Sequence, residues 1–398
     1  MKIAFVGGFA FSPKGTMQAR AFPLAAELVK RGHEVSMFLT PYDNPDDSGR
    51  EWTKAGVRVS NMKTGSSLGA YPRLLFRLWK AVDQYRPELT HIFKPKGFAG
   101  ALASCLLMKG MRNIVVDCDD WEGWGGWNEV KSYPWVIKEF IDRQERWMMR
   151  RAPALTVASR SLNRRVLEAR GSESGVYYVP NGVFAETTSS IYATTSSRSP
   201  AEIRREVHLP EGPLILYSGH FEPAEDPMFL CRVSARVAEE NRAGLVLVGD
   251  GPEQQRVRDF FAQRPAARVH YFPRLPHTQF LQLVHACDIA AFPYPDNQVH
   301  RSKCSARIVD YMRMGKAVIT SAVGQNLEYL ENSKSGLLVP PDDEDAFSAG
   351  LELLLRYPEL RARLGNNART RIQKAFSWSG QPLEQCLAAY EHLTSRRP

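Results

Sequence analysis

The chain starts twice with the same pattern, a short apolar run that ends near a glycine and leads into a helix. The first run is Lys2 to Val6, and the second is Leu214 to Tyr217, which ends at Ser218 and Gly219. Short apolar runs bounded by turn residues are typical of strands buried on both faces, as in parallel sheets. In each half a helix and another apolar run follow, so each half is predicted to begin with a β-α-β unit.

The same alternation continues through both halves. The apolar pattern predicts N-terminal helices at 18–30, 73–85, 100–108 and 135–150, N-terminal strands at 34–39, 89–93, 113–117 and 154–158, and C-terminal strands at 244–249, 269–272 and 317–320. A chain of 398 residues is too long for one ordinary core. We therefore predict an α/β fold of two Rossmann-like domains with parallel sheets, over 1–183 and 213–378, joined by a linker at 184–212.

Composition limits the partners without choosing among them. The net charge of +9 favours nucleotide diphosphates, anionic lipid headgroups or nucleic acid. Six cysteines without metal-ligand spacing favour a reduced cytoplasmic protein over a disulfide or zinc protein. No apolar run approaches the length of a signal or transmembrane segment, so we expect a cytoplasmic protein with peripheral contact to the inner membrane face left open.

The segment from Ser302 to Glu328 carries the most specific chemistry. It places Arg307, Asp310 and Gly315 at offsets that put the cation and the acid on one face of a helix that ends at the glycine. A helix start with a nearby guanidinium binds phosphate, and a carboxylate one turn later accepts bonds from vicinal hydroxyls. The segment therefore predicts a site for a diphosphate with an attached ribose.

This segment resembles the donor-binding signature of retaining family 4 glycosyltransferases of the GT-B fold. The matching positions are Asp310, Tyr311, Met312, Gly315, Gly324 and Glu328. Further landmarks follow in the family's order: Gly8, Arg31 to Val35, Val179 to Val183, Val248 to Pro252, Asp288 with Pro293, and Gly336 to Pro340. Single matches of this kind recur in every Rossmann-like protein, but the ordered set covers most of the chain.

The resemblance implies two facing domains with a cleft between them and a C-terminal helix at 379–398 that crosses back to pack on the N-terminal domain. It also implies a metal-independent hexosyltransferase with no cofactor beside its nucleotide-sugar donor. Arg307 and Lys303 are then the expected phosphate contacts, and Asp310 the ribose contact. The main chain at Arg274 and Leu275 lies where the family holds the base, although an ordinary turn is an equal alternative. The other donor-binding positions implied are Gly8, Gly219, His220, Gly249, Gly251, Ser302, Cys304 and Ser305.

Three positions depart from the family's pattern. The family has an arginine after the first glycine of the C-terminal domain and a lysine five residues later, where this chain has His220 and Glu225. The first glutamate of the helix-opening loop is replaced by Ser302. His300, Arg301, Lys303 and Arg307 cluster there instead, which leads to the hypothesis that these cations compensate for the missing pair; solvation of the loop is the alternative.

In the N-terminal half, a buried strand runs into an acidic loop. The resemblance puts Asp119 near the transferred sugar with Asp120 beside it, and a helix-capping role for Asp120 stays open. Lys94 and Lys96 follow another strand end and either meet an anionic acceptor or are solvated. The loop with Trp121, Trp124 and Trp127 predicts either sugar stacking or a lid.

Two helices have a basic amphipathic pattern, at 73–80 and 147–151, which favours core packing but also occurs on anionic membranes.

The leading hypothesis for function is the transfer of a sugar, with retention, to an acceptor in polysaccharide or glycolipid synthesis. In one alternative this acceptor is lipid-linked. A degenerate protein that binds nucleotide sugar or a partner without turnover is the second hypothesis. Three other functions have weaker support. An epimerase would need paired acids placed for elimination, and an oxidoreductase would need the spaced-glycine fingerprint; the sequence has neither. Only the net charge favours a nucleic-acid binder.

Overall fold

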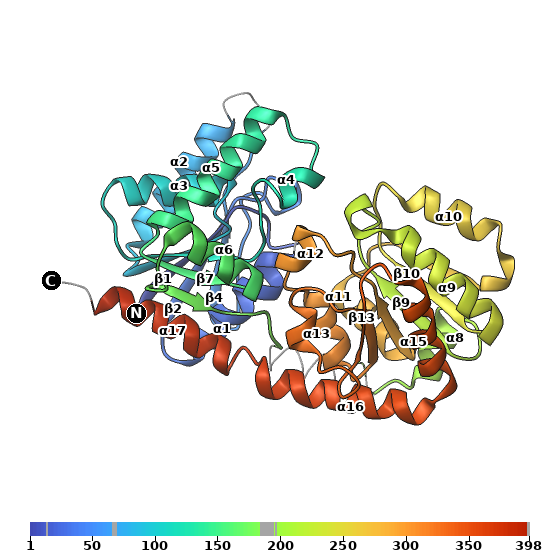
Figure 1. Cartoon of the computed structure of the whole chain (residues 1–398). Coiled ribbons are helices and arrows are strands. Elements are labelled where there is room, and N and C mark those ends of the chain that lie inside the picture. Colours follow the sequence, from blue (N-terminus) through green and yellow to red (C-terminus); the bar gives the residue numbers. More distant parts are fainter. Residues whose placement is uncertain (13–14, 66–69, 184–194, 196, 396–398) are drawn as a thin grey trace. The chain divides into compact units, whose positions relative to one another are not determined.

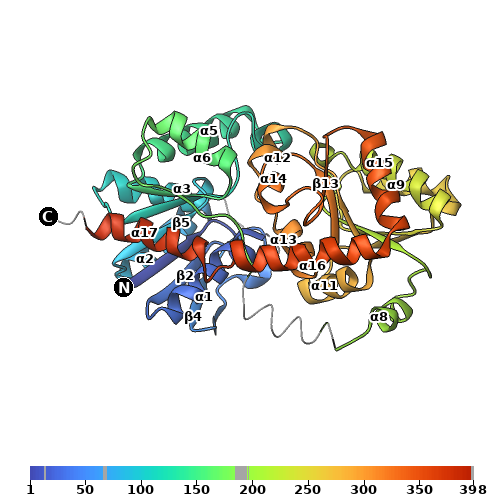
Figure 2. The same cartoon turned by 60° about the horizontal axis from the view of Figure 1, so that its bottom comes forward.

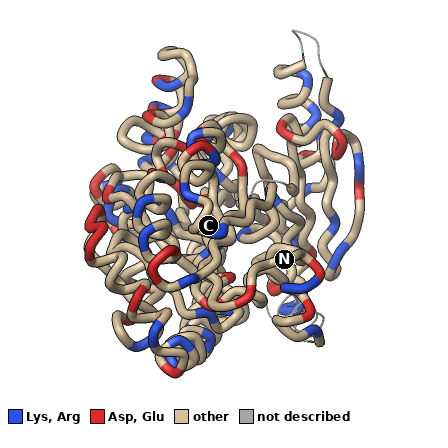
Figure 3. Tube along the Cα trace, turned by 90° about the vertical axis from the view of Figure 1, so that its right-hand side faces the viewer, with Lys and Arg blue, Asp and Glu red and all other residues tan. Residues whose placement is uncertain are grey.

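A computed structural model describes residues 1–12, 15–65, 70–183, 195 and 197–395. The chain divides into two compact units (Figure 1). The N-terminal unit comprises Met1–Gly182, Ser302–Cys304 and Trp378–Pro398, and the C-terminal unit comprises Val183–Arg301 and Ser305–Ser377. Basic and acidic residues are interspersed along the helices of both units (Figure 3).

The N-terminal unit is built on an eight-stranded sheet in the order β3-β4-β2-β1-β5-β6-β7-β8. Its strands are β1 (Lys2–Gly7), β2 (Glu34–Leu39), β3 (Glu51–Lys54), β4 (Val57–Asn61), β5 (Leu89–Phe93), β6 (Ile114–Cys118), β7 (Ala154–Val157) and β8 (Val176–Tyr178). All neighbours are parallel except β3 and β4. The predicted strands are confirmed to within a residue at either end, while the β3-β4 hairpin was not predicted.

Helices cover both faces of this sheet, as a parallel sheet requires. They are the π-helix η1 (Thr16–Ala21), α1 (Phe22–Lys30), the 3-10 turn η2 (Pro45–Asp47), α2 (Ala70–Tyr85), α3 (Gly97–Met108), α4 (Trp127–Val130), α5 (Trp135–Arg151), α6 (Arg160–Arg170) and α17 (Gln381–Thr394). The predicted helix at 18–30 is thus a π-helical turn followed by an α-helix. Helix α17 packs on β7 and β8, beside α1 (Figure 2).

The C-terminal unit has a six-stranded parallel sheet in the order β11-β10-β9-β12-β13-β14. Its strands are β9 (Leu214–Ser218), β10 (Gly244–Val248), β11 (Val269–Phe272), β12 (Ile289–Phe292), β13 (Ala317–Ser321) and β14 (Leu337–Val339). Its helices are α8 (Pro200–Glu206), η3 (Pro223–Glu225), α9 (Pro227–Asn241), α10 (Gln254–Ala262), η4 (Pro265–Ala267), α11 (His277–Ala286), α12 (Gln298–Ser302), α13 (Ala306–Arg313), α14 (Asn326–Tyr329), α15 (Glu344–Arg356) and α16 (Pro358–Ala375).

The strand order places a ligand site in each unit. In the first sheet the order reverses between β1 and β5, and in the second between β9 and β12. Strands diverge to opposite sides at such a switch point, which opens a crevice at their carboxyl ends. The two sequence segments that were predicted to start each half, β1 and β9, are therefore the strands that position the sites.

The segment predicted as a linker is not wholly irregular. Residues 184–194 and 196 of this segment lie outside the described residues. Beyond them α8 forms, because Ser199 and Glu202 make a capping box in which each side chain accepts a bond from the other's backbone N–H. The predicted linker at 184–212 therefore contains a short helix in its described part.

Within the described ranges, no helix is both long enough and apolar enough to cross a bilayer.

Candidate active site

A pocket lies at the carboxyl ends of β9, β10 and β11 in the C-terminal unit. Most of its lining was singled out in the sequence, since it contains Gly219, His220, Gly249, Arg274, Leu275 and Arg307, together with Ser218, Val248, Asp250 and Phe280. Residues from three strand ends and from the first turns of α11 and α13 converge there because parallel strands all end at the same edge of a sheet.

Two glycines let the backbone loops of this pocket pack against each other. Gly249 has φ +143°, and a Cβ built on it would lie 2.0 Å from the carbonyl oxygen of Gly219. Gly251 has φ +152°, and its Cβ would lie 2.6 Å from the carbonyl oxygen of Phe221. Any side chain at either position would force the two loops apart. The loop after β10 therefore packs closely on the loop after β9, and the predicted contact of Gly249 and Gly251 with the donor stays a prediction.

Two guanidinium groups give the pocket its charge. Burial lowers the pKa of Arg274, and the nearby positive charge of Arg307 lowers it further. The Arg307 guanidinium carbon lies 4.8 Å from the centre of the Phe280 ring, which holds it against the pocket wall. Two cations that repel each other in one pocket are stabilised by a bound anion. The sequence reasoning assigned only main-chain contacts to Arg274 and missed its side chain.

Asp310 is held in an ion pair rather than presented alone. Its carboxylate lies 3.1 Å from Nε2 of His277 and 3.3 Å from a guanidinium nitrogen of Arg313. Burial opposes ionisation, but His277, Arg313 and Arg307 outweigh it and lower the pKa of Asp310. The residue is thus an anchored carboxylate one turn after Arg307, and its contact with a ribose stays a prediction.

The predicted cation cluster before α13 is dispersed. Arg301 makes a bidentate pair with Asp296, at 2.6 and 2.7 Å. His300 is buried and bonds to Asn297 over 3.0 Å. Neither residue lines the pocket. Of the four cationic positions, only Arg307 does.

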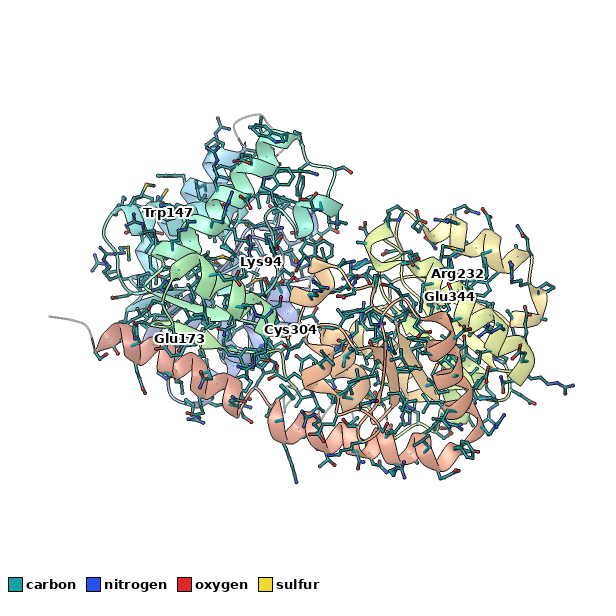
Figure 4. All side chains as sticks on the ribbon, viewed as in Figure 1. Lys94, Trp147, Glu173, Arg232, Cys304 and Glu344 are labelled. Atoms are coloured by element: carbon teal, nitrogen blue, oxygen red, sulfur yellow. The ribbon has the colours of Figure 1, made fainter. Side chains whose placement is uncertain are left out.

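Residues Ser302 to Cys304 belong to the N-terminal unit. The Ser302 carbonyl accepts a bond from Ser159 Oγ at 2.6 Å, and the Cys304 carbonyl accepts one from Asn181 Nδ2 at 2.7 Å (Cys304 is labelled in Figure 4). Lys303 Nζ lies 5.9 Å from the centre of the Trp127 ring. Spacing along the sequence could not show that this loop and Arg307 belong to different units.

Ser305 begins α13 without capping it. Its hydroxyl is buried and makes no hydrogen bond among the described residues.

In the N-terminal unit, Lys94 (labelled in Figure 4) lies at the centre of a cluster of carboxylates. Its Nζ is 3.2 Å from Asp119, 2.6 Å from Asp120 and 2.8 Å from Glu122. Lys96 pairs with the other oxygen of Glu122. We call these five residues the Lys94 cluster. The prediction that Lys94 is solvated was wrong, because the side chain is buried.

The Lys94 cluster contains more negative than positive charge, and the pKa values of its members shift in different directions. Burial works against ionisation of Glu122, but Lys94 and Lys96 outweigh it and lower its pKa to about 2. Burial raises the pKa of Asp120, and Lys94 only partly opposes this. The charges of the three carboxylates raise the pKa of Lys94 despite burial, so the ammonium persists. Burial thus favours the protonated form of Asp120, which suits a group that exchanges a proton or a hydrogen bond with a hydroxyl.

The alternative role of Asp120 as a helix cap is excluded. Helix α4 starts at Trp127 after Gly126, without a side-chain cap.

Asp119, the neighbour of Asp120, is held by two contacts. It accepts a hydrogen bond from Thr16 Oγ1 at 2.8 Å, and it also pairs with Lys94. Gly8, predicted as a donor contact, follows β1. A Cβ built on Gly8 would lie 3.5 Å from Ala99 of α3. Both positions lie at the carboxyl edge of the N-terminal sheet.

The tryptophan loop is fixed by α5 and α6. Trp121 lies under the guanidinium of Arg165, 3.6 Å from its carbon, and Trp124 Nε1 donates to Glu139 at 3.0 Å. Glu145 accepts bonds from the backbone N–H of Glu122 and Gly123. The loop is therefore a packed element that supports the Lys94 cluster, and the alternatives of sugar stacking and a lid stay predictions.

A buried pair beneath this site was not predicted. Arg20 binds Asp117 with two bonds of 2.7 and 2.6 Å, and its third nitrogen donates to the Val179 carbonyl at 2.7 Å. Asp117 lies one residue before the end of β6. An acid near a strand end, together with an arginine in the first helical segment, is the signal that could have found the pair.

Within the described residues, no group of three or more histidine, cysteine, aspartate or glutamate side chains is arranged to hold a metal ion.

These two sheets and the basic pocket define a class of protein, the GT-B proteins. The chain is similar over 99% of its length to sucrose-phosphate synthase from Thermosynechococcus elongatus, with a TM-score of 0.75, 20% identity and 99% of that chain covered. It is also similar to HepE from Anabaena in complex with UDP-glucose, with a TM-score of 0.73, 15% identity, and 99% of this chain and 100% of that chain covered. At these identities the similarity shows the fold, and the predicted GT-B fold class is confirmed.

The family follows from the sequence matches. Residues 15–182 match the Glycosyl transferase 4-like domain, and residues 199–371 match Glycosyl transferases group 1. The chain belongs to the family 4 glycosyltransferases, as the resemblance of its motifs implied.

A relative that matches over nearly the whole chain is phosphatidyl-myo-inositol mannosyltransferase from Mycolicibacterium smegmatis. It is 24% identical over 389 residues, which cover 95% of this chain and 91% of the relative. Two other curated relatives are matched over only 37% and 56% of their own length.

Proposed function

We propose that this protein transfers a sugar from a nucleotide-sugar donor to an acceptor hydroxyl with retention of the anomeric configuration. The single observation that carries the proposal is the pair of guanidinium groups, Arg274 and Arg307, in a pocket bordered by Gly219 and Gly249. The departure of a nucleoside diphosphate leaves negative charge on its phosphates. Preorganised cations and backbone amides at that place lower the barrier without a metal ion.

Arg274 takes over the role of the family's missing cations in this proposal. His220 and Glu225 stand where the family has its arginine and lysine, and the neighbouring cations at 300–303 do not line the pocket. Arg274 approaches from the β11 side and Arg307 from α13, so together they flank a diphosphate. HepE, which has a similar fold, is known in complex with UDP and with UDP-glucose, and this supports a nucleotide-sugar donor for the present protein.

The remaining roles are assigned by position. Asp310, already anchored by His277, accepts bonds from ribose hydroxyls. Asp119 and Asp120 face the acceptor side, and Asp120 accepts a hydrogen bond from the attacking hydroxyl. Because the leaving phosphate can take up that hydroxyl's proton on the face from which it departs, attack on the same face gives retention. A glycan or a glycolipid is the proposed acceptor class.

The test is donor turnover. The purified protein is incubated with UDP-, GDP- and ADP-sugars, and release of the nucleoside diphosphate is measured together with proton NMR of the sugar product. We expect slow hydrolysis or transfer of at least one donor, with the product keeping the donor's anomeric configuration. Binding of a donor without any turnover would favour a degenerate binding protein, and an inverted product would contradict retention.

A further inference from the structure

A basic groove runs beside β11, the last strand at one side of the C-terminal sheet. It encloses about 530 Å³, and its lining shares no residue with the pocket that holds Arg274 and Arg307. The rest of its lining is apolar, and the residues that give the groove its character are Arg258, Arg264, Arg268 and His270, with the rings of Phe261 and Tyr271. We call this set the β11 groove.

Two cations of the β11 groove form no ion pair within the described part of the chain. Arg264 donates to the Phe260 carbonyl at 3.0 Å, and its guanidinium carbon lies 3.9 Å from the centre of the ring of the same residue. Arg268 donates to the Glu211 carbonyl at 3.3 Å, while its Nη2 is buried and makes no hydrogen bond among the described residues. An incoming anion would satisfy that nitrogen and both charges.

The surroundings of the β11 groove keep its charge positive. Burial lowers the pKa of His270, and the charge of Arg268 lowers it further, so the imidazole is neutral at neutral pH. The acids next to the groove in the sequence do not line it: Asp259 accepts a hydrogen bond from Gln255 at 2.8 Å, and Glu211 is exposed. A concave surface with one sign of charge attracts a ligand of the opposite sign.

The outer edge of β11 adds backbone groups to these cations. The carbonyls of Arg268 and Phe272 accept hydrogen bonds from β10 and from the residue after it, so they face the sheet. Because backbone groups alternate sides along a strand, those of Val269 and Tyr271 face outward, where no strand is paired among the described residues. Both residues line the groove. A ligand there meets a strand edge together with two unneutralised guanidinium groups.

An extended acidic peptide fits both features. An added strand pairs with outward N–H and C=O groups, and its alternate side chains lie about 7 Å apart on one face, a spacing suited to separate cations. A compact nucleoside diphosphate is less well matched, since no glycine in the lining brings a cradle of backbone amides. A second copy paired through the same edge would set arginine against arginine, which disfavours it.

We propose that the β11 groove docks an extended acidic peptide segment of a partner protein, which adds to the C-terminal sheet as a strand beside β11 and places carboxylates on Arg264 and Arg268. This docking does not depend on the donor or on turnover.

The probe is a labelled peptide of alternating glutamate and threonine, about eight residues long, and its binding to the full chain is followed by fluorescence anisotropy. We expect it to bind more tightly than the lysine-threonine counterpart and to weaken as salt is raised. Hydrogen exchange of the Val269 and Tyr271 amides is expected to slow at least about tenfold on binding, since pairing protects them. UDP is expected not to compete.

The double variant Arg264→Ala with Arg268→Ala is expected to lose at least about tenfold in affinity for the acidic peptide, and the corresponding double lysine variant to recover part of it. The matched control is Arg356→Ala with Arg363→Ala, which removes two exposed arginines of the same unit outside the groove. It is expected to bind the peptide like the parent. Thermal unfolding of each variant checks that the fold is retained.

A second probe separates strand pairing from charge attraction. The same peptide with every backbone nitrogen methylated keeps its carboxylates but has no N–H groups to donate, so we expect at least about tenfold weaker binding. An oligogalacturonate of equal charge is expected to bind more weakly than the unmodified peptide, because it cannot repeat the hydrogen-bond spacing of a strand.

Four outcomes would overturn the proposal. The parent does not bind the acidic peptide, or the arginine-to-alanine double variant binds it as tightly as the control. The third is equal binding of the methylated peptide without protection of the Val269 and Tyr271 amides, or tighter binding of the oligogalacturonate. The fourth is a concentration-dependent dimer in sedimentation that protects the same amides, which would assign the edge to a second copy. Donor turnover is measured on the same variants without peptide, so failure of docking and failure of the proposed transferase function are distinguishable.

Discussion

At the scale of the residue, the most consequential position is Lys94. It is a buried lysine with φ +69°, a conformation that costs about 1 kcal/mol or more for a residue other than glycine. The conformation is maintained because three carboxylates surround its ammonium. Sequence reasoning found each acid and each lysine but could not pair them, since burial is decided by the packing of α5 and the tryptophan loop above them.

The first prediction concerns Lys94→Met. Removing the ammonium leaves Asp119, Asp120 and Glu122 buried without their shared partner, so we expect a loss of about 3–5 kcal/mol of unfolding free energy near pH 8. Without the cation the folded pKa values of these acids rise above their unfolded values. Their penalty then grows as pH rises above about 4 and is relieved when they are protonated.

Chemical denaturation at pH 5 and pH 8 checks this prediction. The variant should lose less stability at pH 5 than at pH 8. Lys334→Met is the control, since Lys334 pairs with Glu331 at the surface and should cost less than about 1 kcal/mol at either pH. An equal loss at both pH values would contradict the assigned role of the cluster.

At the scale of the element, sequence pattern predicted the buried strands best. The β3-β4 hairpin was missed because β3, Glu51–Lys54, is a polar strand at the edge of the sheet with no apolar run. Its turn residues Ala55 and Gly56 have φ +49° and +75°, which is the geometry of a two-residue hairpin turn. The Ala-Gly pair carries a weaker signal than Asn-Gly.

A second prediction belongs to α15. Asp343 caps this helix by accepting a bond from the Ala346 backbone N–H at 2.9 Å. Helix α15 packs on α9, to which the ion pair of Arg232 and Glu344 also ties it (Figure 4). Asp343→Ala should therefore cost about 1 kcal/mol in thermal unfolding.

Two comparisons sharpen this test. Asp343→Asn, which preserves an oxygen acceptor, should be nearly neutral. Asp345→Ala changes a side chain that is 93% exposed in the same turn and should cost less than about 0.5 kcal/mol. A loss for Asp345→Ala as large as for Asp343→Ala would show that charge near the helix start, not the cap, stabilises α15.

At the scale of the whole molecule, the two-domain α/β fold was predictable because each half repeats one physical unit, a buried strand followed by a covering helix. The basic pocket was half predictable: Arg307 has a recognisable motif, while Arg274 reaches the pocket only because β11 lies beside β10 at the sheet edge. The departure of Ser302 to Cys304 into the N-terminal unit depends on contacts with Ser159 and Asn181, which lie more than a hundred residues away in the chain.

The most direct measurement is calorimetric titration of UDP, GDP and ADP into the parent protein and into Arg274→Ala, Arg307→Ala and Arg258→Ala. Arg258 is the control, because it lies over Tyr271 in the same unit but outside the pocket. The account predicts that at least one nucleotide binds the parent, that each pocket variant weakens it by about tenfold or more, and that Arg258→Ala does not. Equal affinities for the parent and both pocket variants, or no binding of any nucleotide, would contradict it.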